Sequence, residues 1–345
     1  MKHFRISAVA AMLIVSGTVQ ANAAAYSAVY VFGDSLSDNG NLAEVLFRSN
    51  LPNPPSFDNA FTNGPTAAAA LTSYLGYALR PSLWVTGFRD VFGLYGGAAF
   101  VPGTNYAVAG ATAQSQAVGG PANINLPQQV GVYRQATGSV ADPNALYMIF
   151  IGGNDVANAT IQGTGATAIG GAVATELAAV QSLRSAGAAN FLIVNVPNIG
   201  ITPRFTQGSP ALAPTATTLT QLYNRSLASG LAGLNLGGAN VTLFDLYGFN
   251  SRLLANAAGR GLTNLTDPCY TNAPLSAATT AACGPGAANI GGFAYWNEFH
   301  PTGTVHALWA EGFERALGVR VPAPSAAALM LFGLAGLPLL RARPR

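Results

Sequence analysis

A serine in a turn after a predicted strand is the first residue of this chain that could do chemistry. Ser35 lies in the segment Val31-Phe32-Gly33-Asp34-Ser35-Leu36. The Gly-Asp pair predicts a tight turn between a strand and a helix, which would present the serine hydroxyl at a sheet edge. The serine N–H would face the same space, close to a helix N-terminus that favours developing negative charge. An ordinary turn and helix N-cap explains this segment equally well.

A serine nucleophile at neutral pH needs a base, and histidine is the usual one. Beyond the first few residues the chain has two histidines, His300 and His306. His300 lies in a predicted loop, directly before a Pro-Thr pair that would start a helix. His306 falls inside that helix among apolar residues, so we predict that it packs in the core. The candidate base is therefore His300.

Two further segments could supply hydrogen-bond donors to an oxyanion. Gly110 follows a β-prone run, and a glycine lets a backbone N–H approach a ligand where a side chain would block it. By itself this glycine is explained as a strand terminator. Asn154 lies in Gly152-Gly153-Asn154-Asp155, and its side-chain amide can donate to an oxyanion. We expect Asp155 to cap the following helix rather than to act in catalysis.

These segments, in this order, resemble the GDSL or SGNH family of serine esterases and lipases. The match covers residues 29–303 and runs from Gly-Asp-Ser-Leu through a later Gly and Gly-Gly-Asn-Asp to a final His-Pro-Thr. The segment Phe61-Thr62-Asn63-Gly64-Pro65 looks closest to the branch shared by plant GDSL lipases and many bacterial outer-envelope esterases.

The resemblance implies a role for each candidate residue. Ser35 would be the nucleophile and His300 the general base of a carboxylester hydrolase. The oxyanion hole would combine the backbone N–H groups of Ser35 and Gly110 with the side chain of Asn154. The family fold is α/β, a flavodoxin-like three-layer αβα sandwich with a five-stranded parallel sheet. Such an enzyme needs neither a metal nor a cofactor.

Asn297 departs from the family pattern, which has an aspartate three residues before the histidine. An asparagine carbonyl can accept the His300 N–H and fix the tautomer, as in Cys-His-Asn enzymes, but it carries no charge. With the amide reversed the wrong tautomer would result, and in serine proteases the Asp-to-Asn change lowers kcat about 10⁴-fold. Glu298 should point to the other side of an extended loop, and a backbone carbonyl is the alternative partner. We expect a weak but active hydrolase, with Asn297 as the third catalytic residue.

The elements that would position these residues alternate between strands and helices. Five short apolar runs predict buried strands at residues 28–32, 104–108, 146–151, 191–196 and 241–244. Helix-like stretches at 167–186 and 218–234 lie between them. This alternation predicts a parallel sheet with helices on both faces and ligands beyond the carboxyl ends of the strands. We expect residues 51–102 and 255–292 to form long loops of one domain, 26–320.

The N-terminal segment predicts export. A short positive start, residues 1–5, precedes an apolar run to about Val19 and small residues suited to signal peptidase. We expect a signal peptide at 1–25; a first helix is the alternative. Export would place Cys269 and Cys283 in an oxidising compartment, where an even pair predicts one disulfide. Two unpaired buried thiols are the alternative.

The C-terminal segment, residues 321–345, predicts a sorting or anchoring tail. Val321-Pro322-Ala323-Pro324 leads into an apolar run that ends at Leu340 and then into an arginine cluster. It resembles the PEP-CTERM tail of Gram-negative exopolysaccharide producers, which implies an exosortase as partner and an envelope or extracellular location. Ala323 stands where that family has Glu. A plain membrane anchor is the alternative, because the arginines would act as a stop.

Composition excludes several classes of function. The 345 residues are 50% hydrophobic and 8% charged, which excludes a disordered charged chain and a coiled coil. The net charge of +3 does not describe the body of the chain, because five of the 16 basic residues lie at the two ends. Between the ends, 11 basic residues stand against 13 acidic residues. The body therefore has no basic excess for nucleic acid. We also find no phosphate loop and no metal-binding motif.

Three functions remain open from the sequence. The first is a lipase-like carboxylesterase acting on lipid or simple esters. The second, favoured by the tail, removes small acyl groups from exopolysaccharide. The third is a surface binding protein that has lost catalysis, suggested by Asn297. A chain-length profile separates the first two, and reaction of Ser35 with a fluorophosphonate would exclude the third.

Overall fold

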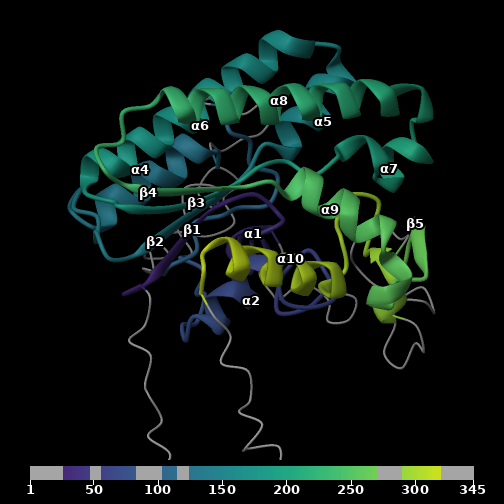
Figure 1. Cartoon of the computed structure of the whole chain (residues 1–345), viewed down its shortest axis with the longest axis horizontal. Coiled ribbons are helices and arrows are strands. Elements are labelled where there is room, and N and C mark those ends of the chain that lie inside the picture. The colour runs from purple at the N-terminus through teal and green to yellow at the C-terminus, as the bar shows by residue number, and fades with distance from the viewer. Residues whose placement is uncertain (1–25, 47–55, 83–102, 115–123, 271–289, 320–345) are drawn as a thin grey trace, which may run out of the picture.

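A three-layer αβα sandwich with a parallel sheet is the architecture of this chain (Figure 1). The computed structural model describes residues 26–46, 56–82, 103–114, 124–270 and 290–319. The sheet has the strand order β1-β2-β3-β4, all parallel, with Val31 opposite Met148 and Phe150 opposite Val194. Its strands are β1 (Val29–Gly33), β2 (Leu146–Phe150), β3 (Asn190–Val194) and β4 (Asn240–Phe244).

Helices cover both faces of the sheet. On one face lie α4 (Leu126–Ala136), α5 (Gly153–Gln162), α6 (Gly165–Ala186) and α8 (Ala213–Gly233). On the other lie α2 (Ala67–Tyr74), α9 (Leu246–Ala255) and α10 (Gly303–Ala316). The remaining elements are α1 (Asn41–Leu46), α7 (Pro203–Thr206), β5 (Asn264–Pro268), β6 (Phe293–Tyr295) and the 3₁₀ turns η1 (Ile199–Ile201), η2 (Pro210–Leu212), η3 (Ala257–Arg260) and η4 (Ile290–Gly292).

Two apolar cores follow from the alternation of side chains along each strand. Tyr147 and Ile149 of β2 pack under α4, α6 and α8, whereas Met148 and Phe150 pack against α2 and α10. Every residue of β2 is buried. This continuous burial confirms the interpretation of the short apolar runs as central strands with helices on both sides.

The expectation of five strands is wrong for the described residues, which form a four-stranded sheet and a separate pair, β5 with β6. Residues 104–108 do run parallel beside β1, where Tyr106 N–H donates to Val31 O at 2.8 Å. They form an isolated bridge rather than a strand. The reason is that Gly33 N–H, which would donate to the Tyr106 carbonyl in the next step of a parallel ladder, donates to Gln129 Oε1 of α4 at 2.8 Å instead. The carbonyls of Asn105 and Ala107 face away from β1 and accept the Asn41 side-chain amide at 2.9 and 2.8 Å. The Gln129 side chain thus uses a backbone group that the ladder would need.

The predicted long loops also contain regular structure. Helix α2 lies within 51–102, and Thr66 caps it by accepting the Ala69 N–H at 3.1 Å. β5 and η3 lie within 255–292. The run of four alanines after a threonine was the helix signal. Residues 51–55, 83–102 and 271–289 of these segments lie outside the described residues.

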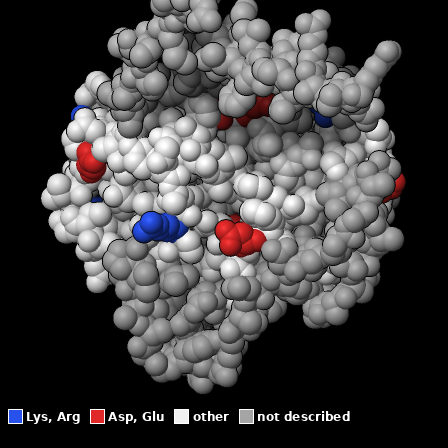
Figure 2. All heavy atoms as spheres, turned by 90° about the horizontal axis from the view of Figure 1, so that it is seen from below, with Lys and Arg blue, Asp and Glu red and all other residues white. Residues whose placement is uncertain are grey.

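Both predicted end segments and one cysteine also lie outside the described residues. The signal peptide at 1–25, the tail at 321–345 and the disulfide partner Cys283 therefore stay predictions. Cys269 is fully buried, with its sulfur 3.6 Å from the Trp296 carbonyl. No helix in the described ranges is long and apolar enough to cross a membrane. Figure 2 shows charged side chains scattered singly over the described part of the lower face, without a basic patch.

Candidate active site

The turn after β1 positions Ser35. The Asp34 side chain accepts the Leu36 N–H at 3.0 Å, and the Asp34 carbonyl accepts the N–H groups of Ser37 and Asp38, both at 3.0 Å. These bonds close the tight turn that the Gly-Asp pair predicts. Ser35 is partly exposed there and lines an open cleft of about 270 Å³. Within the described part of the chain, its backbone N–H has no hydrogen-bond partner.

His300 reaches the serine from the far end of the chain. Its Nε2 lies 2.6 Å from Ser35 Oγ. The histidine belongs to the loop between β6 and α10, where its carbonyl accepts the Trp296 N–H at 2.8 Å and the Asn297 N–H at 3.3 Å. The loop is thus a closed turn rather than an extended segment. The predicted pairing of Ser35 with His300 is present in the structure.

The Asn297 amide decides the tautomer of His300. Asn297 Oδ1 lies 2.9 Å from the Phe299 N, 2.8 Å from the His300 N and 3.0 Å from His300 Nδ1. Two backbone N–H donors require an oxygen at this position, which fixes which way the amide points. Because that oxygen can only accept, Nδ1 carries the proton and Nε2 is the acceptor. The Ser35 hydroxyl therefore donates to His300.

Burial keeps His300 neutral. Desolvation lowers its pKa to about 4, and no carboxylate opposes this effect at Nδ1. Neutral imidazole is the form that can accept the serine proton. Burial also raises the pKa of the neighbouring Asp34 to about 7 and of Asp38 to about 6, although backbone N–H donors favour the charged form of both.

Gly110 and Asn154 line the same cleft as Ser35 and His300. Gly110 has φ +85°, a conformation that favours glycine, and its N–H has no partner among the described residues. Asn154 donates one amide hydrogen to the Ala111 carbonyl at 2.8 Å, which leaves the second for a ligand. The cleft therefore holds three donors suited to an oxyanion, on Ser35, Gly110 and Asn154.

Buried side chains hold these donors in place. Asp38, one turn after the serine, accepts the Ala109 N–H at 2.8 Å and so ties the nucleophile turn to the Gly110 loop. Asp155, in the first turn of α5, accepts the Ala113 N–H at 2.8 Å, so it ties this helix to the loop after Gly110 and is not the helix cap that the sequence predicts. Asp38 is not among the residues predicted from the sequence, although it lies only three residues after Ser35.

The turn before Asn154 also depends on a close approach. Gly152 has φ +106°, and a Cβ there would lie 2.5 Å from the Tyr223 ring. The Tyr223 hydroxyl in turn donates to Glu176 at 2.6 Å, fully buried. Burial raises the pKa of Glu176 to about 8. Only glycine can therefore bring this turn against the helix layer.

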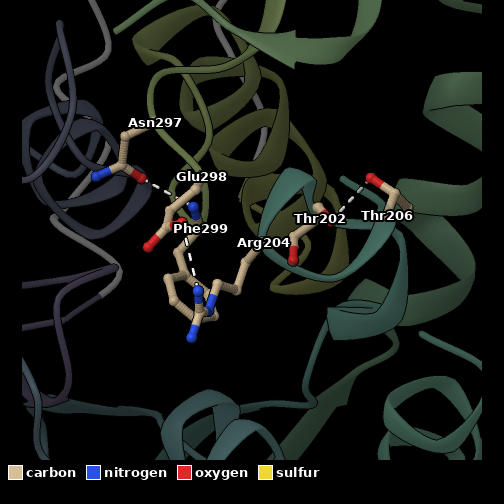
Figure 3. Close-up of polar contacts among 6 residues, drawn as sticks. All are labelled: Thr202, Arg204, Thr206, Asn297, Glu298 and Phe299. Carbon is tan, nitrogen blue, oxygen red and sulfur yellow. Dashed lines mark hydrogen bonds and ion pairs between the residues drawn. The ribbon is translucent and has the colours of Figure 1, made fainter. Parts of the chain in front are cut away.

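Glu298 points away from the histidine. Figure 3 shows its side chain directed toward Arg204, and its carboxylate lies 3.9 Å from the guanidinium. The Arg204 N–H also donates to the Glu298 carbonyl at 2.9 Å. Glu298 therefore links the histidine loop to α7 and does not replace the missing aspartate, in agreement with the sequence expectation.

His306 is a core residue. Its side chain is 1% exposed, its Nδ1 accepts the Ala67 N–H at 3.1 Å, and its ring packs on Trp309. Burial lowers its pKa to about 3. The prediction that this histidine belongs to the core is confirmed. No group of three potential metal ligands occurs in the part of the chain that the structure describes.

Comparison with known proteins agrees with this geometry. GDSL-like lipases and acylhydrolases match the chain over residues 29–313. A GDSL esterase/lipase of Arabidopsis thaliana is 26% identical over 316 residues, which cover 82% of this chain and 84% of the plant protein. Esterase EstA of Pseudomonas aeruginosa is 30% identical over 306 residues, which cover 76% of this chain and 43% of EstA.

Further similarities extend the comparison. An uncharacterized protein from the trpE-trpG intergenic region of Pseudomonas putida is 31% identical over 264 residues, which cover 71% of this chain. The chain spans 40% of the length of that protein, so it corresponds to only part of these bacterial relatives. The solved structure of a catalytic mutant of an acetylxylan esterase from Geobacillus stearothermophilus is also similar, with a TM-score of 0.43 and 15% sequence identity. The similar region covers 85% of this chain and 94% of the esterase chain.

Proposed function

The chain belongs to the family of GDSL-like lipases and acylhydrolases, and on that premise we propose that it is a serine carboxylester hydrolase. The observation that carries the proposal is the continuous hydrogen-bonded series Ser35 Oγ, His300 Nε2, His300 Nδ1 and Asn297 Oδ1, with distances of 2.6 and 3.0 Å. Nucleophile, base and orienting group are the three parts that nucleophilic acyl transfer requires.

Acylation follows from this arrangement. His300 Nε2 takes the Ser35 proton while Oγ bonds to the ester carbonyl carbon. The carbonyl oxygen becomes an oxyanion within reach of the donors on Ser35, Gly110 and Asn154. When the intermediate collapses, the bond to the alcohol breaks and His300 gives the proton to that alcohol. The product of this half-reaction is an acyl-serine.

Deacylation repeats the same steps with water. His300 takes a proton from water, the hydroxide bonds to the acyl carbon, and the bond to Ser35 Oγ breaks as Oγ recovers the proton. The acid is released. Throughout, Asn297 keeps the Nδ1–H tautomer, but it offers the transient imidazolium only a dipole. We therefore propose a hydrolase slower than one with an aspartate at this position.

The location of the protein is a separate proposal. The end segments favour export and a place in the envelope of, or outside, a Gram-negative bacterium, with signal peptidase and an exosortase as processing partners. The substrate would then be a lipid ester or an acylated polysaccharide. Mass spectrometry of the protein from its host, compared with the translated sequence, would test both processing events, since unprocessed ends would contradict them.

The test of the activity uses nitrophenyl esters from acetyl to palmitoyl and a fluorophosphonate probe. Turnover and labelling should both disappear in Ser35→Ala. Ser37→Ala is the matched control, because Ser37 Oγ is buried two residues away and has no partner in the described part of the chain. Labelling that persists in Ser35→Ala would contradict the assignment. Absence of turnover and labelling in the wild type would instead favour a binding protein without catalysis.

A further inference from the structure

A second cavity lies directly behind the active-site cleft. It lies among α9, α10, β6 and the segment after β3, and three side chains line both spaces: Leu36, Ile199 and Phe299. We propose that this cavity receives the acyl chain of the substrate, with these three side chains as its entrance. The inference rests on the proposed ester hydrolysis and adds the substrate class to it.

The entrance lies at the reacting centre. Leu36 follows Ser35 in the chain, and Phe299 precedes His300, so two of the three shared side chains are covalent neighbours of the reacting residues. Figure 3 shows Phe299 on the same turn as Asn297. A group attached to Ser35 Oγ therefore needs to pass only one layer of side chains to leave the cleft for the cavity.

The wall of the cavity fits an apolar occupant. Leu254, Val305 and Trp309 line it, and none of the described residues around it is charged. The oxygen atoms of its polar side chains already have partners, whereas the amide nitrogens of Asn198 and Asn250 have none among the described residues. Asn250 Oδ1 accepts the Trp309 Nε1–H at 3.0 Å, and Thr202 Oγ1 donates to the Ile199 carbonyl at 2.8 Å. Because most of the wall is apolar, a sugar would leave most of its hydroxyl groups unpaired here, whereas a hydrocarbon chain carries no group that needs a partner.

The size of the cavity limits the chain. Its volume is about 40 Å³. A site for one water needs roughly 10–15 Å³ on this scale, so the cavity has room for about three groups of that size. Two or three carbons beyond the carbonyl would fill it. The structure therefore points to short acyl chains such as butanoyl rather than to palmitoyl.

The acyl group, and not the alcohol, is assigned to the cavity because of the order in which the two products leave the enzyme. The alcohol must leave before water can attack the acyl-serine, and the open cleft offers it a path to solvent. The acyl chain stays covalently bound to Ser35 during that time. A more enclosed space behind the nucleophile suits the group that remains.

The test compares nitrophenyl esters of rising acyl length with alkyl acetates of rising alcohol length. Leu254→Phe should fill the cavity from α9, where the side chain is partly exposed, and Val305→Ala should enlarge it from α10. Leu308→Phe is the matched control, since Leu308 packs against the same core but does not line the cavity. Circular dichroism and fluorophosphonate labelling would check that each variant folds with a reactive Ser35.

The expected result is a change in selectivity and not in overall rate. Two added methylene groups should raise kcat/KM of the wild type for butanoate about 15-fold over acetate. Leu254→Phe should bring that ratio close to one, and Val305→Ala should move the preferred acyl length to longer chains. Leu308→Phe should leave both the ratio and the preferred acyl length unchanged.

Three outcomes would overturn the assignment. A wild-type ratio near one, or a ratio that Leu254→Phe leaves unchanged, would show that the cavity does not select acyl chains. A variant that changes only the dependence on alcohol length would place the alcohol there. In all these cases Ser35 still reacts with the fluorophosphonate, so the hydrolase proposal survives. Loss of that reaction in the wild type would remove both proposals together.

Discussion

Replacing Asn297 with aspartate tests the electrostatic reasoning about the base. The substitution puts a carboxylate oxygen where Oδ1 now lies, 3.0 Å from His300 Nδ1. The backbone N–H groups of Phe299 and His300 already donate to this position, and such donors favour an ionised carboxylate. The backbone around Oδ1 would therefore stabilise the carboxylate charge that Asn297→Asp introduces.

The magnitude follows from the distance. Two unit charges 3.0 Å apart interact by about 1.4 kcal/mol in water and about 5.5 kcal/mol at an effective dielectric constant of 20. Because the His300 side chain is only partly buried, solvent from the cleft screens part of this interaction, and we take values up to about 4 kcal/mol, which correspond to a pKa rise of about one to three units. The pKa of His300 should move from about 4 to roughly 5–7.

The assay is the pH dependence of kcat/KM, which reports the free enzyme. His300 acts as a base only when neutral, so activity is lost as pH falls through its pKa. The wild type should keep its activity down to about pH 4–5, whereas Asn297→Asp should lose activity below roughly pH 6. At pH 8 the variant should be about 10- to 1,000-fold faster, because the carboxylate stabilises the imidazolium.

Glu298→Gln is the matched control. It removes a charge from the adjacent residue, whose carboxylate contacts Arg204 and not the histidine. Its pH profile should follow that of the wild type. An Asn297→Asp variant that is slower at every pH, or whose acidic limb does not move, would refute the view that Oδ1 acts on His300 as described.

Three further predictions concern the oxyanion donors and the buried network. Asn154→Ala removes one donor and should lower kcat about 10²- to 10³-fold with little change in KM; a pure KM effect in steady-state kinetics would contradict the role. Gly110→Ala forces a side chain into φ +85° and should lower thermal stability by about 1 kcal/mol together with kcat; differential scanning calorimetry showing a more stable variant would contradict the strain. Glu176 has a pKa of about 8 in the folded state and about 4.5 unfolded, so its contribution to the free energy of unfolding falls as pH rises through that window. Glu176→Gln should therefore gain stability relative to the wild type between about pH 4.5 and 8 in urea unfolding, and a constant difference would contradict the pKa shift.

Much of the candidate site could be read from local sequence. Ser35, Gly110 and Asn154 each follow a buried apolar run, and the ends of neighbouring parallel strands meet at one sheet edge. Residue type and order along the chain were therefore sufficient to predict that these three residues lie at one site. The helix at residues 67–74 was missed because its neighbours are rich in loop-forming residues, although the alanine run favours a helix.

Other features depend on contacts between distant segments. The edge segment 104–108 has the composition of a strand, but its pairing with β1 stops where Gly33 N–H donates to the Gln129 side chain of α4. The cavity behind the cleft is bounded by side chains from elements far apart in the chain. A local sequence pattern does not show which polar groups will have hydrogen-bond partners in the folded protein. It also does not show where packing leaves a cavity between side chains.

The sequence by itself determined the chemistry that the chain can attempt, because a nucleophile, a base and oxyanion donors are residue types at readable positions. The tertiary structure decided whether Asn297 can serve as the third member. An amide has an oxygen and a nitrogen of nearly equal size, and only the backbone N–H groups of residues 299 and 300 select the oxygen for the histidine. That selection fixes the imidazole tautomer, and with it the direction in which the serine proton can move.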